Sequence, residues 1–272
     1  MKVLIGGLGD LGRRCARRWA AAGHQVLGLR RRPDTSAADI EVLAADLAAL
    51  RPGQFDAIDL ALFCAAPDAR NETAYRHCYF SAASAFMASV PAAALRILVS
   101  STAVMDGADG EWVDEQRFAP ASRWNGMLLA EAEQQLRATW PDLCVLRPSG
   151  LYGPGRERLL RKARAGELGE GRYSHRIHID DCAKAIVHLA ALPLRETSYL
   201  LTDDAPLPEW QVLSGLAAMF GLPAARRGPA AVGRRLSNAR LHASGFKFDY
   251  PEFRAGYRAI VCGGDDGSAA AA

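Results

Sequence analysis

Seven residues near the N-terminus carry the clearest chemical signal in the sequence, Gly6-Gly7-Leu8-Gly9-Asp10-Leu11-Gly12. They directly follow an apolar run with strand character and open a stretch with helical periodicity. Glycines at this spacing allow a tight turn and a close approach of the backbone to a ligand, and the free N–H groups of a helix start favour an anion. The pattern predicts a dinucleotide pyrophosphate site, with contacts from Gly6, Gly9, Asp10, Leu11 and Gly12.

The end of the second predicted strand indicates which ribose such a dinucleotide would carry. An enzyme that prefers NAD usually has an acidic residue there, roughly 20 residues further on, to accept from the 2′-hydroxyl. This sequence has Arg30, Arg31 and Arg32 instead. Guanidinium groups bind phosphate through forked hydrogen bonds, so we expect NADP(H) to be preferred, with NAD(H) as the alternative. A solvated basic loop in an Arg-rich chain is the competing interpretation.

Short apolar runs alternate with longer helical patterns over the first 150 residues. Strands are predicted at 3–5, 25–29, 41–44, 58–64, 96–100 and 143–147, and helices at 11–22, 71–90 and 124–140. Such alternation is typical of a parallel sheet that is covered by helices on both faces. The sequence therefore predicts an α/β fold, a Rossmann-type doubly wound parallel sheet with a small C-terminal substrate lobe.

The pattern changes after residue 150, where glycine and proline become denser and the elements shorten. Helices are predicted at 156–165, 181–191 and 208–220. We divide the chain into a dinucleotide-binding domain (1–150) and a small substrate-binding lobe (151–262) that is interleaved with the last strands. The low-complexity tail (263–272) has nothing to pack, and we expect it to be disordered.

Composition limits the classes of function. A net charge of +3 without a concentrated basic face gives no signal for nucleic acid. No apolar run approaches the ~20 residues of a membrane helix, and the apolar start is too short for a signal peptide. We therefore expect a cytoplasmic protein with no membrane partner. The six cysteines are scattered without zinc spacing, so no metal site is expected.

Together with the glycine loop, several other stretches of the sequence resemble the extended short-chain dehydrogenase/reductase superfamily, the NAD-dependent epimerase/dehydratase group. The resemblance runs to about residue 260. Its matching stretches are Ala45-Asp46-Leu47, Phe63-Cys64-Ala65-Ala66-Pro67, Val99-Ser100-Ser101-Thr102-Ala103-Val104, Arg147-Pro148-Ser149-Gly150-Leu151-Tyr152-Gly153-Pro154-Gly155-Arg156 and Arg176-Ile177-His178-Ile179-Asp180-Asp181. It implies cofactor contacts from Asp46, Leu47, Cys64, Ala65, Ala66, Ser100, Pro148 and Leu151.

The catalytic signature of that superfamily, Tyr-x-x-x-Lys, is missing from this sequence. Family spacing counted back from Ala130-Glu131 puts the Tyr at Arg123 and the Lys at Met127, and the segment 120–135 contains neither Tyr nor Lys. In the family the Lys lowers the pKa of the Tyr, so the two work as a pair. With the stretches 237–241 and 251–257, this departure resembles the atypical, YeeZ-type members.

Four residues remain as catalytic candidates. The resemblance implies that Thr102 hydrogen-bonds the substrate oxygen, and Arg123 or Asn125 could polarise a carbonyl. Tyr152, in a turn that approaches the nicotinamide in the family, is the nearest Tyr that could replace the missing acid. Each has a structural alternative, which is a strand-end cap for Thr102, an ordinary helix start for Arg123 and Asn125, and a packing role for Tyr152.

Two functions are consistent with these residues. The first is an NADP(H)-dependent oxidoreductase or epimerase-like enzyme that acts on a small carbonyl or related substrate through a non-standard catalytic site. The alternative is a catalytically silent NADP(H)-binding sensor or regulatory protein. We favour the enzyme because the stretch 148–156 and the substrate lobe are retained. The expected partners are a small-molecule substrate and, from the resemblance, a second copy in a homodimer.

Overall fold

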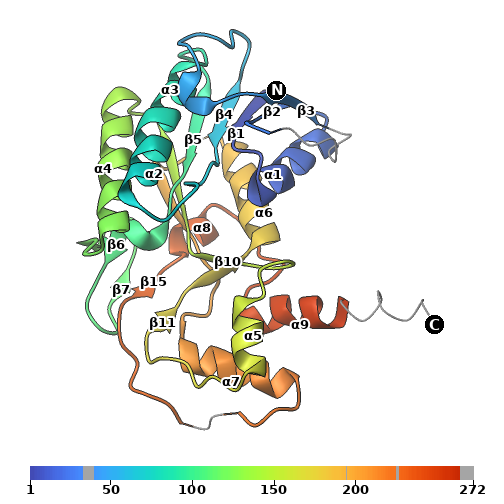
Figure 1. Ribbon diagram of the computed structural model, residues 1–272, viewed down its shortest axis with the longest axis vertical. Helices are drawn as coiled ribbons and strands as arrows, with labels where there is room; N and C mark the ends of the chain where they lie inside the picture. Colours follow the sequence, from blue (N-terminus) through green and yellow to red (C-terminus); the bar gives the residue numbers. More distant parts are fainter. Residues whose placement is uncertain (33–39, 194, 225–226, 264–272) are drawn as a thin grey trace, which may run out of the picture. The chain divides into compact units, whose positions relative to one another are not determined.

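A seven-stranded parallel sheet is the centre of the computed structural model, which describes residues 1–32, 40–193, 195–224 and 227–263 (Figure 1). Its strand order is β13-β9-β5-β4-β1-β2-β3. The strands are β1 (Lys2–Gly6), β2 (Gln25–Arg30), β3 (Glu41–Ala44), β4 (Leu60–Phe63), β5 (Leu95–Val99), β9 (Cys144–Pro148) and β13 (Ser198–Leu201). The predicted Rossmann-type α/β fold is confirmed.

The strand order reverses at β1: β2 and β3 lie on one side of it, and the later strands β4, β5, β9 and β13 lie on the other. Strand β1 pairs with β2 on one side, Val3 opposite Val26, and with β4 on the other, Val3 opposite Leu60. All four residues of β4 are buried, as expected for a strand covered on both faces. In open α/β sheets, ligands bind outside the carboxyl ends of the strands at such a reversal.

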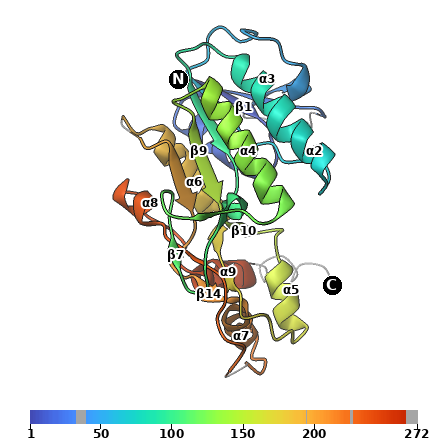
Figure 2. The same ribbon diagram turned by 90° about the vertical axis from the view of Figure 1, so that its left-hand side faces the viewer.

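Helices cover both faces of this sheet. Helices α1 (Asp10–Ala21) and α6 (Ile179–Ala190) lie on one face, and α2 (Glu72–Arg76), α3 (Ala83–Ala88) and α4 (Trp124–Thr139) lie on the other (Figures 1 and 2). The side chains of Cys15, Ala16 and Trp19 form the buried stripe of α1. Among the described residues, no helix is both long and apolar enough to cross a bilayer.

Two features of the sheet and its helices differ from the sequence-based expectation. The helix predicted over 71–90 is divided by a π-helical turn (His77–Ala82) between α2 and α3. Strand β13 was not predicted, because four residues without alternation give no periodic signal. Turns of π-helix occur mostly as single turns and often lie at functional sites.

The described chain divides into two units. Unit 1 comprises Met1–Met105, Ala119–Arg147 and Ala183–Tyr199, and unit 2 comprises Asp106–Phe118, Pro148–Cys182 and Leu200–Ala272 as far as it is described. Unit 2 holds the short strands and helices β7 (Trp112–Val113), β10 (Gly150–Tyr152), α5 (Arg158–Arg164), β11 (Tyr173–Ser174), β12 (Arg176–His178), β14 (Leu207–Pro208), α7 (Glu209–Met219), β15 (Arg235–Leu236), α8 (Ala239–Ala243) and α9 (Phe253–Gly263). Residues 264–272 of the expected tail lie outside the described residues.

A buried charge network fixes α4 on the sheet within unit 1. Glu133, on the buried side of α4, accepts from Arg147 of β9, with a shortest distance of 2.6 Å between Nη2 and Oε2. Ser100, directly after β5, donates its hydroxyl to Glu133 Oε1 at 2.6 Å. The three side chains are at most 6% exposed, so the ion pair neutralises two buried charges.

We predict that Glu133→Ala lowers the free energy of unfolding by about 3–5 kcal/mol, because it leaves the guanidinium of Arg147 buried without its partner. Chemical denaturation followed by circular dichroism measures this change. Glu131→Ala is the matched control, since Glu131 lies on the same helix but is exposed, 3.5 Å from Arg76, and should change stability by less than ~1 kcal/mol. Equal losses in the two variants would contradict the assignment.

Candidate functional site

The glycine loop joins β1 to α1 at the reversal point of the sheet. The backbone N–H groups of Gly7 and Leu8 both donate to the carbonyl of Leu29 in β2, at 3.2 and 3.4 Å. On the other side, Cys64 N–H donates to the carbonyl of Gly6 at 2.7 Å. The loop is therefore held between the carboxyl ends of β2 and β4.

Three of the loop glycines are required by close packing. Gly7 has a φ of +96°, and a Cβ there would overlap the backbone of Ala65. A Cβ on Gly12 would overlap the carbonyl oxygen of Gly7, and one on Gly6 would lie 2.8 Å from the ring of Phe86. These glycines let strand, loop and helix approach one another, as the loop pattern predicts.

Gly9 is different, because a Cβ there would meet no atom within 4 Å. Gly9 is the N-cap residue of α1 and, as a glycine, makes no capping bond with a side chain of its own. The space beside Gly9 thus lies at the start of a helix, and helix N-termini bind phosphate through their first N–H groups. Asp10 in the first turn is paired with Arg14, with 2.9 Å between Oδ1 and Nε. Leu11 and Gly12 are buried beneath the loop. The residues present thus fit a dinucleotide pyrophosphate.

Basic side chains from the end of β2 meet an acidic side chain from another segment. Arg30 is half-buried as the last residue of the strand, and Arg31 and Arg32 are exposed. The guanidinium of Arg31 forks onto the carboxylate of Asp68, with 2.8 Å between Nη1 and Oδ2 and a second contact between Nη2 and Oδ1. Hydrogen bonding to Arg31 lowers the pKa of Asp68. Asp68 belongs to the segment after β4. The end of β2 has no acidic residue of its own, but the fold brings the Asp68 carboxylate to it.

The other predicted adenosine contacts lie at the ends of β3 and β4. Asp46 accepts from Ala48 N–H at 3.1 Å and so caps a short 3-10 turn (Leu47–Ala49), in which Leu47 is buried. Directly after β4, burial raises the pKa of the Cys64 thiol to about 12, which keeps the thiol neutral. Ala65 lies against Gly7, and Ala66 is exposed. These residues follow the ends of β3 and β4 in unit 1, and Cys64 and Ala65 contact the glycine loop.

The segment after β5 holds the predicted Ser100 and Thr102. The hydroxyl of Ser100 is engaged by Glu133, as described above. Ser101 accepts from Ala103 N–H at 3.1 Å and so starts a 3-10 turn whose first residue is Thr102. Thr102 is 8% exposed. The sequence predicts a cofactor contact for Ser100 and a substrate contact for Thr102. The structure shows that the Ser100 hydroxyl has a structural partner, Glu133.

The start of α4 packs closely on this 3-10 turn. A Cβ on Gly126 would overlap the carbonyl oxygen of Ala103, so only glycine permits the observed approach. Arg123 is the exposed N-cap residue of the helix and makes no capping bond with its side chain. Asn125, half-buried, follows within the first turn. The helix start therefore lies against the segment that carries Thr102.

The structure offers Glu133, rather than Glu131, as the glutamate from which the family spacing of the missing signature is counted. Glu131 is exposed, whereas Glu133 is the carboxylate buried against the sheet. The same family spacing counted from Ala132-Glu133 puts the Tyr at Asn125 and the Lys at Leu129, which is 3% exposed. Neither register contains a Tyr or a Lys, so the absence of the signature does not depend on the count.

A tyrosine on a neighbouring helix lies beside the start of α4. The ring of Tyr75 on α2 makes an edge contact with Trp124, the first residue of α4, with 5.0 Å between ring centroids. Its hydroxyl makes no hydrogen bond within the described parts of the chain, and the side chain is half-buried. Tyr79, one turn on, is buried, and burial raises its pKa. Sequence reasoning missed Tyr75 because it lies outside the usual signature helix.

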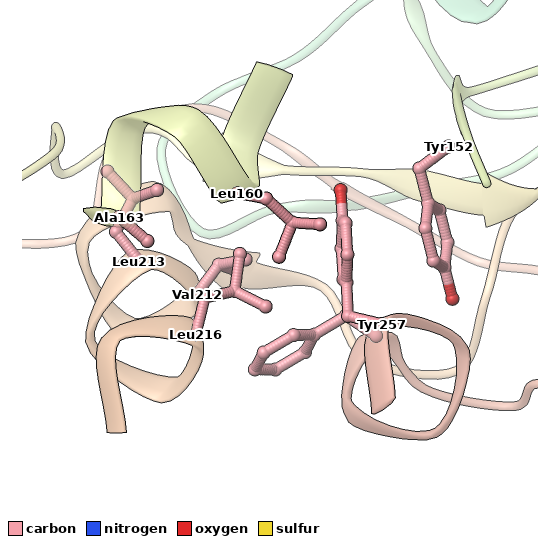
Figure 3. Close-up of a cluster of buried hydrophobic side chains, with 8 residues drawn as sticks. Tyr152, Leu160, Ala163, Val212, Leu213, Leu216 and Tyr257 are labelled. Atoms are coloured by element: carbon pink, nitrogen blue, oxygen red, sulfur yellow. The ribbon is translucent and has the colours of Figure 1, made fainter. Parts of the chain in front are cut away.

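Tyr152 lies in the core of unit 2. It is 3% exposed and stacks on Tyr257, with 4.5 Å between ring centroids, and Tyr257 lies between it and the aliphatic side chains of α5 and α7 (Figure 3). Desolvation raises the pKa of its hydroxyl, and a Cβ on Gly256 would overlap that hydroxyl. These contacts favour the packing role for Tyr152. Pro148 is buried at the end of β9, and Leu151 is half-buried in β10.

His178 and Asp181 of the predicted Ile-His motif also have structural partners in unit 2. Asp181 is fully buried and accepts from the backbone N–H groups of Asp249 and Tyr250, at 2.9 and 2.8 Å. The ring of His178 lies 4.0 Å from that of Tyr250. The motif thus fixes the segment before α9 onto the start of α6.

Comparisons with known proteins agree with these observations. The family model of the RmlD substrate binding domain matches residues 1–169. A solved structure from Methylobacillus flagellatus, described as an NAD-dependent epimerase/dehydratase, is 35% identical, with a TM-score of 0.79 over 97% of this chain and 98% of that chain. The human epimerase family protein SDR39U1, solved with NADPH, shares the fold at 20% identity, with a TM-score of 0.72 over 96% of this chain and 99% of that chain.

A curated relative is similar over a shorter stretch. The 3-diazoavenalumate denitrifying reductase of a Streptomyces species is 36% identical over 131 residues, which are 43% of this chain. The matched stretch spans 42% of that relative's own length.

We predict that Gly12→Ala lowers the free energy of unfolding by about 1–3 kcal/mol, because the new methyl group overlaps the carbonyl of Gly7. Gly9→Ser should leave stability within ~0.5 kcal/mol, since its Cβ enters open space and serine is a favoured N-cap residue. Urea denaturation compares the two variants. A larger loss for Gly9→Ser than for Gly12→Ala would refute the described loop packing.

Proposed function

We propose a function from the premise that this chain belongs to the RmlD substrate-binding domain family, within the NAD-dependent epimerases/dehydratases of the extended short-chain dehydrogenase/reductase superfamily. It is an NADP(H)-dependent oxidoreductase that reduces a small carbonyl or related group. The observation that carries this proposal is the free space at Gly9, the N-cap residue of α1, beside a strand end with three arginines.

The cofactor would bind along the carboxyl edge of the sheet in unit 1. The N–H groups after Gly9 hold the pyrophosphate, and Asp46 and the backbone of Cys64–Ala66 lie along the adenosine. Arg30, Arg31 and Arg32 supply the positive charge for a 2′-phosphate. Pro148 and Leu151, which belong to unit 2, are further cofactor contacts that the resemblance implies.

The chain's own residues must orient the substrate and supply a proton. Bound reduced nicotinamide supplies the hydride. The hydroxyl of Thr102 and the amide of Asn125 hydrogen-bond the substrate oxygen, whose negative charge grows as the hydride arrives. Arg123, exposed at the same helix start, attracts an anionic substrate. In place of the missing signature Tyr, the phenol of Tyr75 gives its proton to that oxygen and then regains one from water.

A second substrate class needs no proton donor. Hydride addition to an arenediazonium ion releases N₂ and leaves a C–H bond, with atoms and charge balanced and no proton consumed. The denitrifying reductase that is 36% identical over part of this chain is named for a diazo substrate. The absence of Tyr and Lys from α4 favours including such substrates in a screen.

The same absence supports the second candidate function, a catalytically silent NADP(H)-binding sensor. Loss of the usual proton relay costs a binding protein nothing, because binding depends on the glycine loop and the arginines. Cofactor binding without turnover of any carbonyl or diazo compound would favour the sensor. Turnover would exclude it.

We predict that the chain binds NADPH and that Gly9→Val abolishes binding without unfolding the protein. The Cβ of residue 9 has free space, but the two valine methyl groups would occupy the pyrophosphate site. Nicotinamide fluorescence measures binding, and circular dichroism checks the fold. Gly23→Ala, at a glycine with a φ of +79° in the turn after α1, is the control and should retain binding. Unchanged NADPH affinity in Gly9→Val would contradict the proposed site.

We predict that Tyr75→Phe lowers kcat for carbonyl reduction at least tenfold, because general acid catalysis contributes about 10²–10⁴-fold. Reduction of a diazo substrate, which needs no proton, should be unaffected. Spectrophotometric NADPH oxidation with 4-nitrobenzaldehyde and with a benzenediazonium salt measures both reactions. Tyr79→Phe is the matched control, since Tyr79 is buried one turn away. A wild-type rate in Tyr75→Phe with the aldehyde would remove Tyr75 from the mechanism.

A further inference from the structure

We infer that Asp68 is a specificity-determining residue, which competes with the 2′-phosphate of NADP(H) for the guanidinium of Arg31. The inference rests on the proposed function and adds a residue that the sequence does not connect to cofactor choice. Asp68 is separated from Arg31 by 37 positions, yet the fold places their side chains in contact.

The geometry of the pair occupies the groups that a phosphate would use. Both terminal nitrogens of Arg31 donate to the two carboxylate oxygens of Asp68. Forked contacts of this kind are how arginine binds carboxylate and phosphate alike. The two terminal nitrogens of Arg31 cannot form the same paired hydrogen bonds with two anions at once. A 2′-phosphate therefore has to displace the Asp68 carboxylate or bind the remaining N–H groups of Arg31.

The surrounding charges reinforce the competition. Asp46 lies near enough to raise the pKa of Arg31 further, after the larger effect of Asp68. His77, the residue at the end of α2, contributes to lowering the pKa of Asp68. A phosphate that approaches Arg31 therefore meets the negative charge of Asp68 and Asp46 as well as the guanidinium. Arg30 and Arg32 are the neighbouring cations that offset this repulsion.

The intact pair also has a use for NAD(H). An acidic residue beside the adenosine ribose accepts from its hydroxyl groups and favours the cofactor without the phosphate. The end of β2 lacks such a residue, and the Asp68 carboxylate lies against Arg31 at this end. With Arg31 held by Asp68 the site suits NAD(H), and with Arg31 released it suits NADP(H). The pair thus makes cofactor choice a balance between two states.

The size of the effect follows from exposure. The two side chains are 59% and 60% exposed, so water screens their attraction. Exposed ion pairs change an equilibrium by about 1.5- to 5-fold. Removing the carboxylate should therefore strengthen NADPH binding by that factor and weaken NADH binding, rather than switch the preference completely.

The test measures dissociation constants of NADPH and NADH for the full chain by nicotinamide fluorescence, in wild type, Asp68→Asn, Arg31→Gln and the double variant. Asp68→Asn should raise NADPH affinity about 1.5- to 5-fold and raise the ratio of NADPH to NADH affinity. In the Arg31→Gln background the same change should raise NADPH affinity by a smaller factor than in wild type, because only the repulsion by Asp68, and not the competition for Arg31, is then removed. Glu72→Gln, which removes one charge from an exposed position in unit 1, controls for the net charge.

Three results would overturn the inference. Weaker NADPH binding by Asp68→Asn would mean that Asp68 holds Arg31 in place for the phosphate. An unchanged affinity ratio, or an equal change in Glu72→Gln, would mean that the pair has no part in selection. Failure of wild type to bind either cofactor would overturn the proposed function itself, and the inference with it, whereas cofactor binding with an insensitive Asp68 would overturn the inference alone.

Discussion

The carboxylate of Glu133 is buried in a parallel α/β domain, and the domain can keep it there only because Arg147 and Ser100 meet it. A buried charge without a partner costs several kcal/mol, so the pair fixes which turn of α4 faces the sheet. The contact joins α4 to β9, the strand that follows it, and to the end of β5, 33 positions before Glu133. It thereby sets the height and rotation of α4, and with them the place of its first residues.

Close backbone packing transmits this constraint to the candidate site. Gly126 lets the start of α4 contact the 3-10 turn after β5, so Asn125 and Thr102 lie on adjoining segments. The glycine loop obeys the same rule, since Gly7 and Gly12 permit contacts that no side chain would allow. Among the four loop glycines, Gly9 is the one where a Cβ would meet no atom within 4 Å, and it is the N-cap residue of α1.

Much of this arrangement could be predicted from sequence, because it depends on local periodicity. Buried strands such as β4 are continuous apolar runs, and α1 carries an apolar stripe, so their positions were predicted to within a few residues. Side-chain pairing through space could not be predicted. Glu131 and Glu133 are both glutamates on one helix, and only packing distinguishes the exposed one from the buried one.

The same limit applies to chemistry that crosses between elements. The sequence places three arginines and no acid at the end of β2, whereas the fold brings Asp68 to Arg31 from the segment after β4. Tyr75 lies beside Trp124 because α2 packs along α4, and the π-helical turn that follows it has no periodic signature. Local patterns therefore identify the dinucleotide loop, while the residues that select a cofactor or donate a proton depend on tertiary contacts.

A crystal structure of the chain with NADP⁺ bound tests the central claim most directly. The account predicts the pyrophosphate against the N–H groups that follow Gly9, at hydrogen-bonding distance, and the 2′-phosphate beside Arg31. A dinucleotide bound elsewhere, or one whose 2′-phosphate lies in solvent away from the arginines at the end of β2, would contradict it.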